Sequence, residues 1–235
     1  DWYVSNVLIV FFFLSGYLMY KQQGFSLKHK LTSIGRSLLL PYFLFTIVLA
    51  LPKAFVHGHS IDWESLLLPI LTGRASWFIA ALIVSEVVFS LFLWITRGKV
   101  ISLLILSLCA FVGSVLLTKQ STDYPWCINN ALQAVLFLYI GWFYHLWKEV
   151  FNRINTPLYT SFLFISLIII KGYATCKGVH TMIYPLSIDS YFLFFLDMLT
   201  SIFLLVNVCK QLPRCKLVEW VGAHSIVYYF VCGGV

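Results

Sequence analysis

Charged residues are scarce in this chain of 235 residues. Only 11% of its residues are charged, whereas 60% are hydrophobic, and the mean hydropathy is +0.89. A water-soluble domain carries roughly 25% charged residues, because charge solvates its surface. The scarcity of charge therefore excludes an ordinary soluble domain and predicts that lipid covers most of the surface.

The sequence also lacks the spacings that bind metals. Its cysteines form no CxxC pair, and no cysteine and histidine are spaced along the sequence as in known metal-binding motifs. We therefore predict no metal site and no bound cofactor. Most cysteines lie in or beside apolar runs, where a thiol behaves as a small hydrophobic group. A disulfide between Cys127 and Cys176 is left open, because both residues are expected on the outer side.

Long apolar runs are what the chain does have, and they predict an all-α, polytopic bundle of about eight transmembrane helices. Each run is long enough to cross a hydrocarbon layer of about 30 Å at about 1.5 Å per residue. No soluble domain interrupts the series, so residues 1–235 are predicted to form a single membrane domain. Asp62–Thr72 is shorter, amphipathic and contains Pro69, which favours an interfacial or re-entrant segment. The eight predicted spans are Val4–Tyr20, Leu38–Val56, Trp77–Thr96, Val100–Thr118, Asn130–Trp147, Pro157–Tyr173, Tyr191–Lys210 and Val218–Val235.

Basic residues are divided unequally between the two sides of this layout. Cytoplasmic loops of membrane proteins collect Lys and Arg, so the side with more of them is predicted to be cytoplasmic and Asp1 to lie outside. The larger set is Lys21, Lys28, Lys30, Arg36, Arg97, Lys99, Lys148, Arg153, Lys210, Arg214 and Lys216. The smaller set is Lys53, Arg74, Lys119, Lys171 and Lys177. The net charge of +7 is thus explained by loop charge beside a lipid bilayer, and no nucleic-acid partner is predicted.

Two carboxylates fall inside predicted spans. Glu86 and Asp197 would each cost roughly 2.5–3.5 kcal/mol to insert, so we expect both to face the interior of the bundle or a wet cavity. Ser190, Thr200 and Ser201 share the helical face of Asp197. Both carboxylates either line a functional cavity or form interhelical hydrogen bonds that lock the packing.

The basic segment Lys21–Arg36 follows the first span. Lys28, Lys30 and Arg36 lie near Ser15 and Gly16, at the predicted inner end of that span. Cations at the mouth of a bundle can bind a phosphorylated ligand, and Arg can grip phosphate oxygens through two hydrogen bonds. Ordinary loop charge or contact with lipid headgroups explains the same pattern, so both interpretations stay open.

Five segments in order resemble the acyltransferase 3 family of integral membrane acyltransferases, in its fucose 4-O-acetyltransferase-like branch. The motifs are FFFLSGYLMYK at Phe11–Lys21, LKHKLTSIGRSLLLPY at Leu27–Tyr42, SWFIAALI at Ser76–Ile83, YPWCINNALQAVLFLYIGWFY at Tyr124–Tyr144 and EWVGAHSIVYY at Glu219–Tyr229. The resemblance implies transfer of an acyl group, usually acetyl from cytoplasmic acetyl-CoA, to a hydroxyl of a cell-envelope carbohydrate. It also implies a fold of about ten helices, of which the eight predicted here are the inner ones, in a bacterial plasma membrane.

The resemblance suggests roles for the residues singled out above. The predicted acyl-CoA site contains Lys28, Lys30, Arg36, Ser15 and Gly16, with the cations on the CoA phosphates and Gly16 leaving room for the acyl-carrying arm. The predicted acceptor site and cavity contain Arg74, Trp77, Phe78, Glu86, Asp197 and Ser225. An aromatic ring at the outer end of the Trp77 helix could stack on a sugar face.

The catalytic base is not assigned. In the family a histidine of the first helix, paired with an arginine, is thought to act as base, and it would lie upstream of Asp1. Because a positioned base contributes roughly 10²–10⁴-fold, we expect residues 1–235 alone to be inactive or severely impaired.

Two other functions fit the same sequence. In a transporter or flippase of a polysaccharide pathway, Glu86 and Asp197 would couple ions or bind substrate. The sequence shows no inverted repeat and no matching pair of broken helices, which such transporters often have. A non-catalytic membrane scaffold on the same fold is the third candidate, because fold does not dictate function.

Overall fold

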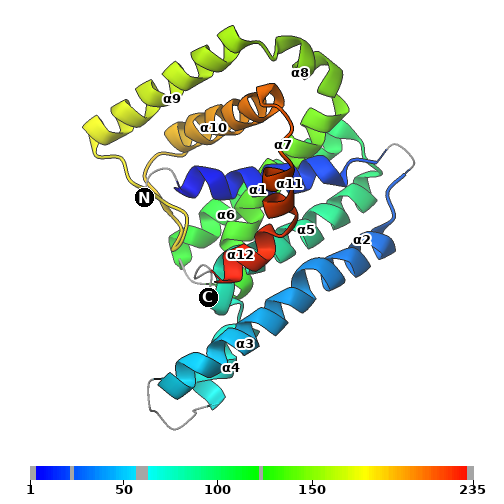
Figure 1. The fold of residues 1–235 in the computed structure, drawn as a ribbon, viewed down its shortest axis with the longest axis vertical. Helices are drawn as coiled ribbons and strands as arrows, with labels where there is room; N and C mark the ends of the chain where they lie inside the picture. Colours follow the sequence, from blue (N-terminus) through cyan, green and yellow to red (C-terminus); the bar gives the residue numbers. More distant parts are fainter. Residues whose placement is uncertain (1–3, 22–23, 57–62, 122–123, 232–235) are drawn as a thin grey trace.

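The computed structural model describes residues 4–21, 24–56, 63–121 and 124–231, and Figure 1 shows them as a bundle of helices. The elements in chain order are α1 (Val4–Met19), α2 (Leu27–Ile34), the π-helix η1 (Gly35–Leu39), α3 (Leu40–Val56), α4 (Trp63–Leu71), the 3-10 helix η2 (Arg74–Ser76), α5 (Trp77–Thr96), α6 (Val100–Gln120), the 3-10 helix η3 (Pro125–Cys127), α7 (Ile128–Leu146), α8 (Lys148–Ile154), α9 (Pro157–Lys177), the strands β1 (Thr181–Met182) and β2 (Ser187–Ile188), α10 (Tyr191–Gln211), α11 (Lys216–Ala223) and α12 (Ser225–Val231).

Helix α7 forms the centre of the bundle. It contacts α1, α5 and α6, and it is the most buried of the long apolar helices. Small residues at Ala131, Ala134 and Gly141 are buried on it and let neighbouring helices come close, as small residues do between membrane helices. Helix α9 is the least buried long helix and packs on α10, and α10 in turn contacts α1 (Figure 1).

The all-α, polytopic fold predicted from the sequence is confirmed. Among the described residues, 6 continuous helical segments are long and apolar enough to cross a membrane, and Val7–Met19 is a shorter apolar helix. The 6 segments are Leu27–Leu49, Arg74–Thr96, Val100–Gln120, Pro125–Leu146, Pro157–Lys177 and Tyr191–Gln211. A helix satisfies all its backbone hydrogen bonds internally, which is why apolar sequences of this length take that form in lipid.

The second span begins earlier in the chain than predicted. The structure places Leu27–Leu49 in one continuous helical segment, so most of the basic segment assigned to a loop is helical. The Ser26 side chain accepts a hydrogen bond from the His29 N–H and caps the start of α2. Lys28 and Lys30 are therefore held on a helix, and Arg36 lies on the π-helix that continues it.

The last predicted span, Val218–Val235, is interrupted. Helix α11 ends at Ala223, His224 has non-helical dihedral angles, and α12 starts at Ser225. The His224 ring contributes Nδ1 to a 2.8 Å hydrogen bond with the Trp220 carbonyl, which turns the ring back onto α11. Neither helix is long enough to span a bilayer alone, because a span needs roughly 17–25 residues.

The short segment before α5 forms α4, with Pro69 inside it. Helix α4 packs beside α3, and Figure 1 shows this pair extending away from the rest of the bundle. The predicted position of Asp1, the start of the Asp62–Thr72 segment and the last residues of the eighth predicted span lie outside the described residues. Cys127 and Cys176 are not bonded to each other, so the disulfide left open by the sequence does not form.

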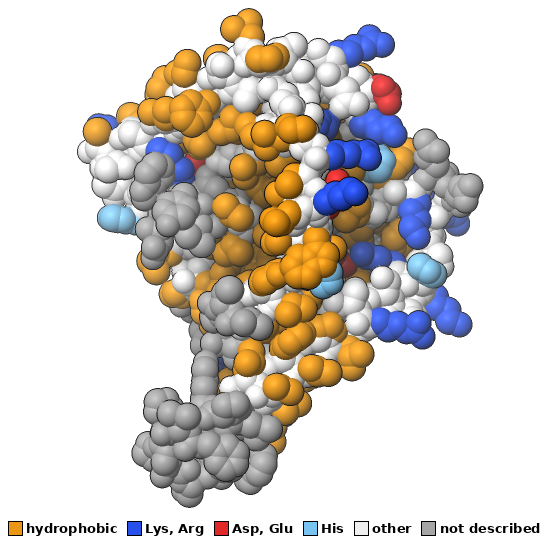
Figure 2. Space-filling view, in the orientation of Figure 1, with side chains coloured by type: hydrophobic (Ala, Val, Ile, Leu, Met, Phe, Trp, Pro, Cys, Tyr) orange, Lys and Arg blue, Asp and Glu red, His pale blue; other side chains and the backbone are white. Residues whose placement is uncertain are grey.

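Lys and Arg side chains gather at one edge of the molecule. Figure 2 shows them along the right-hand edge, where Figure 1 places the start of α2 and helix α8. The end of α1 lies toward the same side (Figure 1). This arrangement agrees with the predicted separation of basic loops, and the assignment of this edge to the cytoplasm stays a prediction.

Candidate functional site

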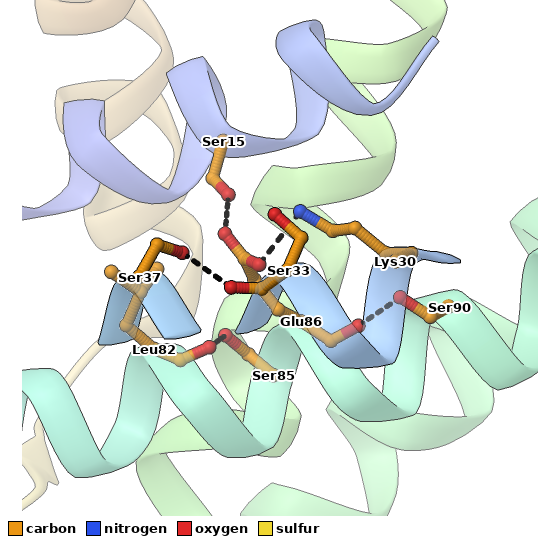
Figure 3. A network of polar contacts seen from close by, with 8 residues as sticks. All are labelled: Ser15, Lys30, Ser33, Ser37, Leu82, Ser85, Glu86 and Ser90. Atoms are coloured by element: carbon orange, nitrogen blue, oxygen red, sulfur yellow. Dashed lines mark hydrogen bonds and ion pairs between the residues drawn. The ribbon is translucent and has the colours of Figure 1, made fainter. Parts of the chain in front are cut away.

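Three helices contribute to a charged network inside the bundle. Glu86 of α5 is only 6% exposed, and its Oε2 lies 2.8 Å from the Lys30 Nζ of α2. The Ser15 hydroxyl of α1 donates a hydrogen bond to Oε1 of Glu86, and Figure 3 shows these contacts. The residues Ser15, Lys30 and Glu86 thus form one network, whereas the sequence predicts Ser15 and Lys30 in the acyl-CoA site and Glu86 in the acceptor cavity.

The network compensates for the burial of a carboxylate. An unpaired charge in the interior costs several kcal/mol, and an ion pair with further hydrogen bonds offsets much of that penalty. The Lys30 side chain is 25% exposed and the Glu86 side chain 8%, so the lysine is the partner closer to the surface. The network therefore ties the basic helix α2 to α1 and α5 at a fixed position.

The other two predicted phosphate-binding cations remain exposed. Lys28 lies in the first turn of α2, and Arg36 lies in η1, which directly follows α2 in the chain. Within the described parts of the chain, neither makes an ion pair with a carboxylate. Lys28 and Arg36 can therefore bind an anionic ligand, whereas the charge of Lys30 is already balanced by Glu86.

Gly16 has a different role from the one predicted. A Cβ at Gly16 would lie 1.9 Å from the Leu138 carbonyl oxygen of α7, and a Cβ at Gly141 would lie 1.9 Å from the Phe13 carbonyl oxygen of α1. The two glycines therefore allow the backbones of α1 and α7 to cross in contact. The space beside Gly16 that was expected to receive an acyl chain is filled by α7.

A cavity of about 750 Å³ lies at the other end of these helices. Trp77 and Asp197, both predicted acceptor residues, line it, and so do Lys171 and Tyr184. The Lys171 Nζ lies 2.6 Å from Oδ2 of Asp197, and the Trp77 and Tyr184 rings stack with centroids 5.1 Å apart at an interplanar angle of 2°. Leu8 of α1, the β1–β2 hairpin and α10 complete the walls.

The remaining predicted acceptor residues do not line this cavity. Phe78 is 4% exposed, and its ring packs against Phe11, Phe12 and Tyr229, so no sugar can stack on it in this structure. Arg74 is exposed in η2, and Ser225 is half-buried at the start of α12.

Sequence reasoning missed Lys171 and Tyr184. The distribution of basic residues assigns Lys171 to the outer loops, and no motif of the sequence points to Tyr184. The available signal was that Lys171 is the one charge within a long apolar run, Pro157–Tyr173, where a charge needs a partner. The partner itself, Asp197, lies on another helix, and the sequence does not reveal which helices touch.

Together these features define an all-α polytopic membrane protein with an ion pair inside the bundle and, at the opposite ends of its helices, a largely apolar cavity with aromatic rings and an ion pair in its wall. A family model described as an acyltransferase domain, that of the acyltransferase 3 family, matches residues 7–231. The chain belongs to this family, since the match covers most of its length, and the family's activity is acyl transfer at a membrane. No curated protein and no solved structure matches the chain.

Proposed function

We propose that the full-length protein transfers acetyl from acetyl-CoA, bound at the cytoplasmic side, to a hydroxyl of a cell-envelope carbohydrate at the outer side. The hydroxyl oxygen attacks the thioester carbonyl carbon, an ester C–O bond forms and the C–S bond breaks. The hydroxyl proton passes to a base, and CoA leaves as its thiol after taking up a proton. The base itself is not assigned to a residue of this chain.

The observation that carries the proposal is the Ser15–Glu86–Lys30 network. It fixes α2 against the helix that contains the FFFLSG motif and leaves Lys28 and Arg36 exposed beside it. Phosphate groups are bound best by cations held on a rigid element, because less side-chain freedom is lost on binding. The basic edge of the bundle therefore suits the phosphorylated end of acetyl-CoA.

The distance between the two ends of the site supports transfer through the bundle. Leu8 at the cavity and Ser15 at the network lie 7 positions apart on α1, and at about 1.5 Å per residue this is a separation of about 10 Å. Between them, Phe12 and Phe78 are buried and in contact. An acyl group carried on the extended pantetheine arm of CoA could cover this interval, whereas the charged phosphates would stay at the basic edge.

Substitution of Arg36 tests the donor site. In the full-length protein, we expect Arg36→Ala to raise the KM for acetyl-CoA about tenfold, because a charge-assisted hydrogen bond to phosphate is lost. Arg153→Ala is the matched control, since Arg153 is exposed on α8, a helix that Figure 1 places at the same edge. An unchanged KM in Arg36→Ala, or an equal increase in both variants, would rule out this donor site.

Proteoliposomes distinguish the proposal from transport. With acetyl-CoA outside the vesicles and a carbohydrate acceptor inside, an acyltransferase produces acetylated sugar in the lumen. A flippase instead moves intact carbohydrate and leaves acetyl-CoA unchanged, and a scaffold does neither. The expected inactivity of residues 1–235 alone stays a prediction, which the same assay measures.

A further inference from the structure

The cavity at the end opposite the basic edge has the size and composition of a small-molecule site. Its volume of about 750 Å³ falls within the range of roughly 300–1,000 Å³ found for ligand pockets. Most of its lining is apolar, contributed by side chains such as Leu8, Ile183 and Phe194. A few polar groups converge on this lining, and that combination is typical of sites that orient a specific ligand.

Two aromatic rings contribute to the cavity wall. Trp77 starts α5 and Tyr184 belongs to the turn between β1 and β2, and their rings are parallel. The apolar C–H face of a sugar ring packs well on aromatic surface of this kind, because aromatic side chains supply large contact area with little conformational freedom to lose.

The hairpin that carries Tyr184 is held in place. The Asn130 side-chain amide of α7 donates a hydrogen bond to the Ile183 carbonyl, and the His180 N–H donates to Oδ2 of Asp189 at 2.8 Å. Thr181 pairs with Ile188 and Met182 with Ser187 in the antiparallel register. The cavity wall is therefore pre-organised, so less order has to be gained when a ligand binds.

The Lys171–Asp197 pair supplies polar groups without net charge. A carboxylate has about four acceptor positions and an ammonium three donors. Their side chains are 15% and 13% exposed, so they are largely removed from bulk water while lining the cavity. Sugar hydroxyls, which both donate and accept, match this pair.

Net charge also determines which sugars are disfavoured. The Lys and Asp of the lining balance each other, and the lining contains no Arg and no further Lys among the described residues. A carboxylated or phosphorylated sugar would bring an uncompensated negative charge next to Asp197, which like-charge repulsion and desolvation both oppose.

We propose that this cavity binds the acceptor, and that the acceptor unit it takes is an uncharged pyranose, held on Trp77 and Tyr184 and hydrogen-bonded by Lys171 and Asp197. The assignment rests on the proposed function, because it places the acceptor hydroxyl where the acetyl group arrives. It adds two residues that the sequence did not place in the site, Lys171 and Tyr184, and a preference for neutral over anionic sugars.

Binding can be measured without the donor. The full-length protein is placed in lipid nanodiscs, which avoid glycoside detergents, and saturation-transfer NMR is recorded with methyl glycosides of glucose, galactose, mannose and fucose and with methyl glucuronide. We expect at least one neutral glycoside to receive saturation and methyl glucuronide to receive little.

Trp77→Ala should weaken neutral glycoside binding about tenfold, while Trp77→Phe should retain most of it. Trp94→Ala is the control, because Trp94 lies on the same helix, is 59% exposed and does not line the cavity.

The outcomes separate this inference from the proposed function. Glycoside binding that depends on Trp77, in a protein that transfers no acetyl, supports the cavity and overturns the acyl transfer. Acetyl transfer with a sugar KM that is the same in Trp77→Ala and Trp94→Ala overturns the cavity and leaves the acyl transfer in place. The cavity assignment also fails if no neutral glycoside binds, if methyl glucuronide binds best, or if only lipid chains receive saturation.

Discussion

The two partners of the Lys30–Glu86 ion pair differ in how far each can reach. Lys30 has a long, flexible stem and a side chain that is 25% exposed, whereas Glu86 is short and starts from the buried face of α5. A lysine that loses its partner can extend toward the interface, as long cationic side chains do near membrane surfaces. A buried glutamate that loses its partner has no such route.

This asymmetry predicts unequal effects of substitution. Lys30→Met should lower the free energy of unfolding by about 3–5 kcal/mol, because it leaves Glu86 charged and buried, with Ser15 as its remaining side-chain partner among the described residues. Glu86→Gln should cost only about 1–2 kcal/mol, since the amide still accepts from Ser15 and Lys30 can move outward. Reversible unfolding of both variants, and of the double variant, measures the difference.

Lys28→Met is the control for that experiment, because Lys28 is an exposed lysine on the same helix. It should change stability by less than about 0.5 kcal/mol, as surface substitutions usually do. If Glu86→Gln destabilises the protein as much as Lys30→Met, the proposed difference in reach is wrong.

Helices α1 and α7 cross so closely that their contact depends on two glycines. At Gly16 and Gly141 a methyl group would overlap a backbone carbonyl of the other helix, and a backbone atom cannot move aside as the end of a flexible side chain can. The contact joins the helix of the FFFLSG motif to the most buried helix of the bundle. The position of Ser15, and so of the network, depends on this crossing.

Gly16→Ala should therefore separate the two helices. We expect it to lower the free energy of unfolding by about 1–3 kcal/mol, the usual effect of overpacking, and to raise the KM for acetyl-CoA because Ser15 moves relative to Glu86. Gly172→Ala on α9 is the matched control, since a Cβ there meets no atom within 4 Å. The control should keep or slightly raise stability, because Ala favours helix more than Gly. Equal Tm values for the two variants would contradict this account of the crossing.

The whole bundle has a donor edge and an acceptor edge in our proposal, and this polarity can be tested directly. Single cysteines at positions 28 and 36 should react with a membrane-impermeant thiol reagent only after the inner face is exposed, while a cysteine at position 74 should react in intact cells. The exchanges are Lys28→Cys, Arg36→Cys and Arg74→Cys in a background without the native cysteines. All three positions are exposed, so reagent access reports sidedness and not burial.

Labelling of positions 28, 36 and 74 from the same side would overturn the orientation, and with it the route from donor to acceptor. A result with the sides reversed would keep the separation of the two ends but place the basic edge outside, contrary to the distribution of basic residues between loops.

Most of the spans could be predicted from the sequence, because the requirement that creates them is local. An uninterrupted apolar run must satisfy its backbone hydrogen bonds within itself, so α5, α6, α7, α9 and α10 appear close to their predicted bounds. The prediction was less accurate where polarity and helix formation disagree. The basic residues of α2 suggested a loop although Ser26 caps a helix there, and the apolar stretch after Val218 suggested one helix although His224 interrupts it.

Local composition also identified which residues needed partners. The cost of a charge in lipid marked Glu86 and Asp197 as inward-facing before any contact was known. The identity of their partners came from packing, since Lys30 and Glu86 are 56 positions apart and Lys171 and Asp197 are 26 apart. Hydropathy is a property of each segment alone, so the spans could be predicted along the chain. A contact depends on how several segments cross. The charged network, the glycine crossing and the cavity were therefore decided only by the folded bundle.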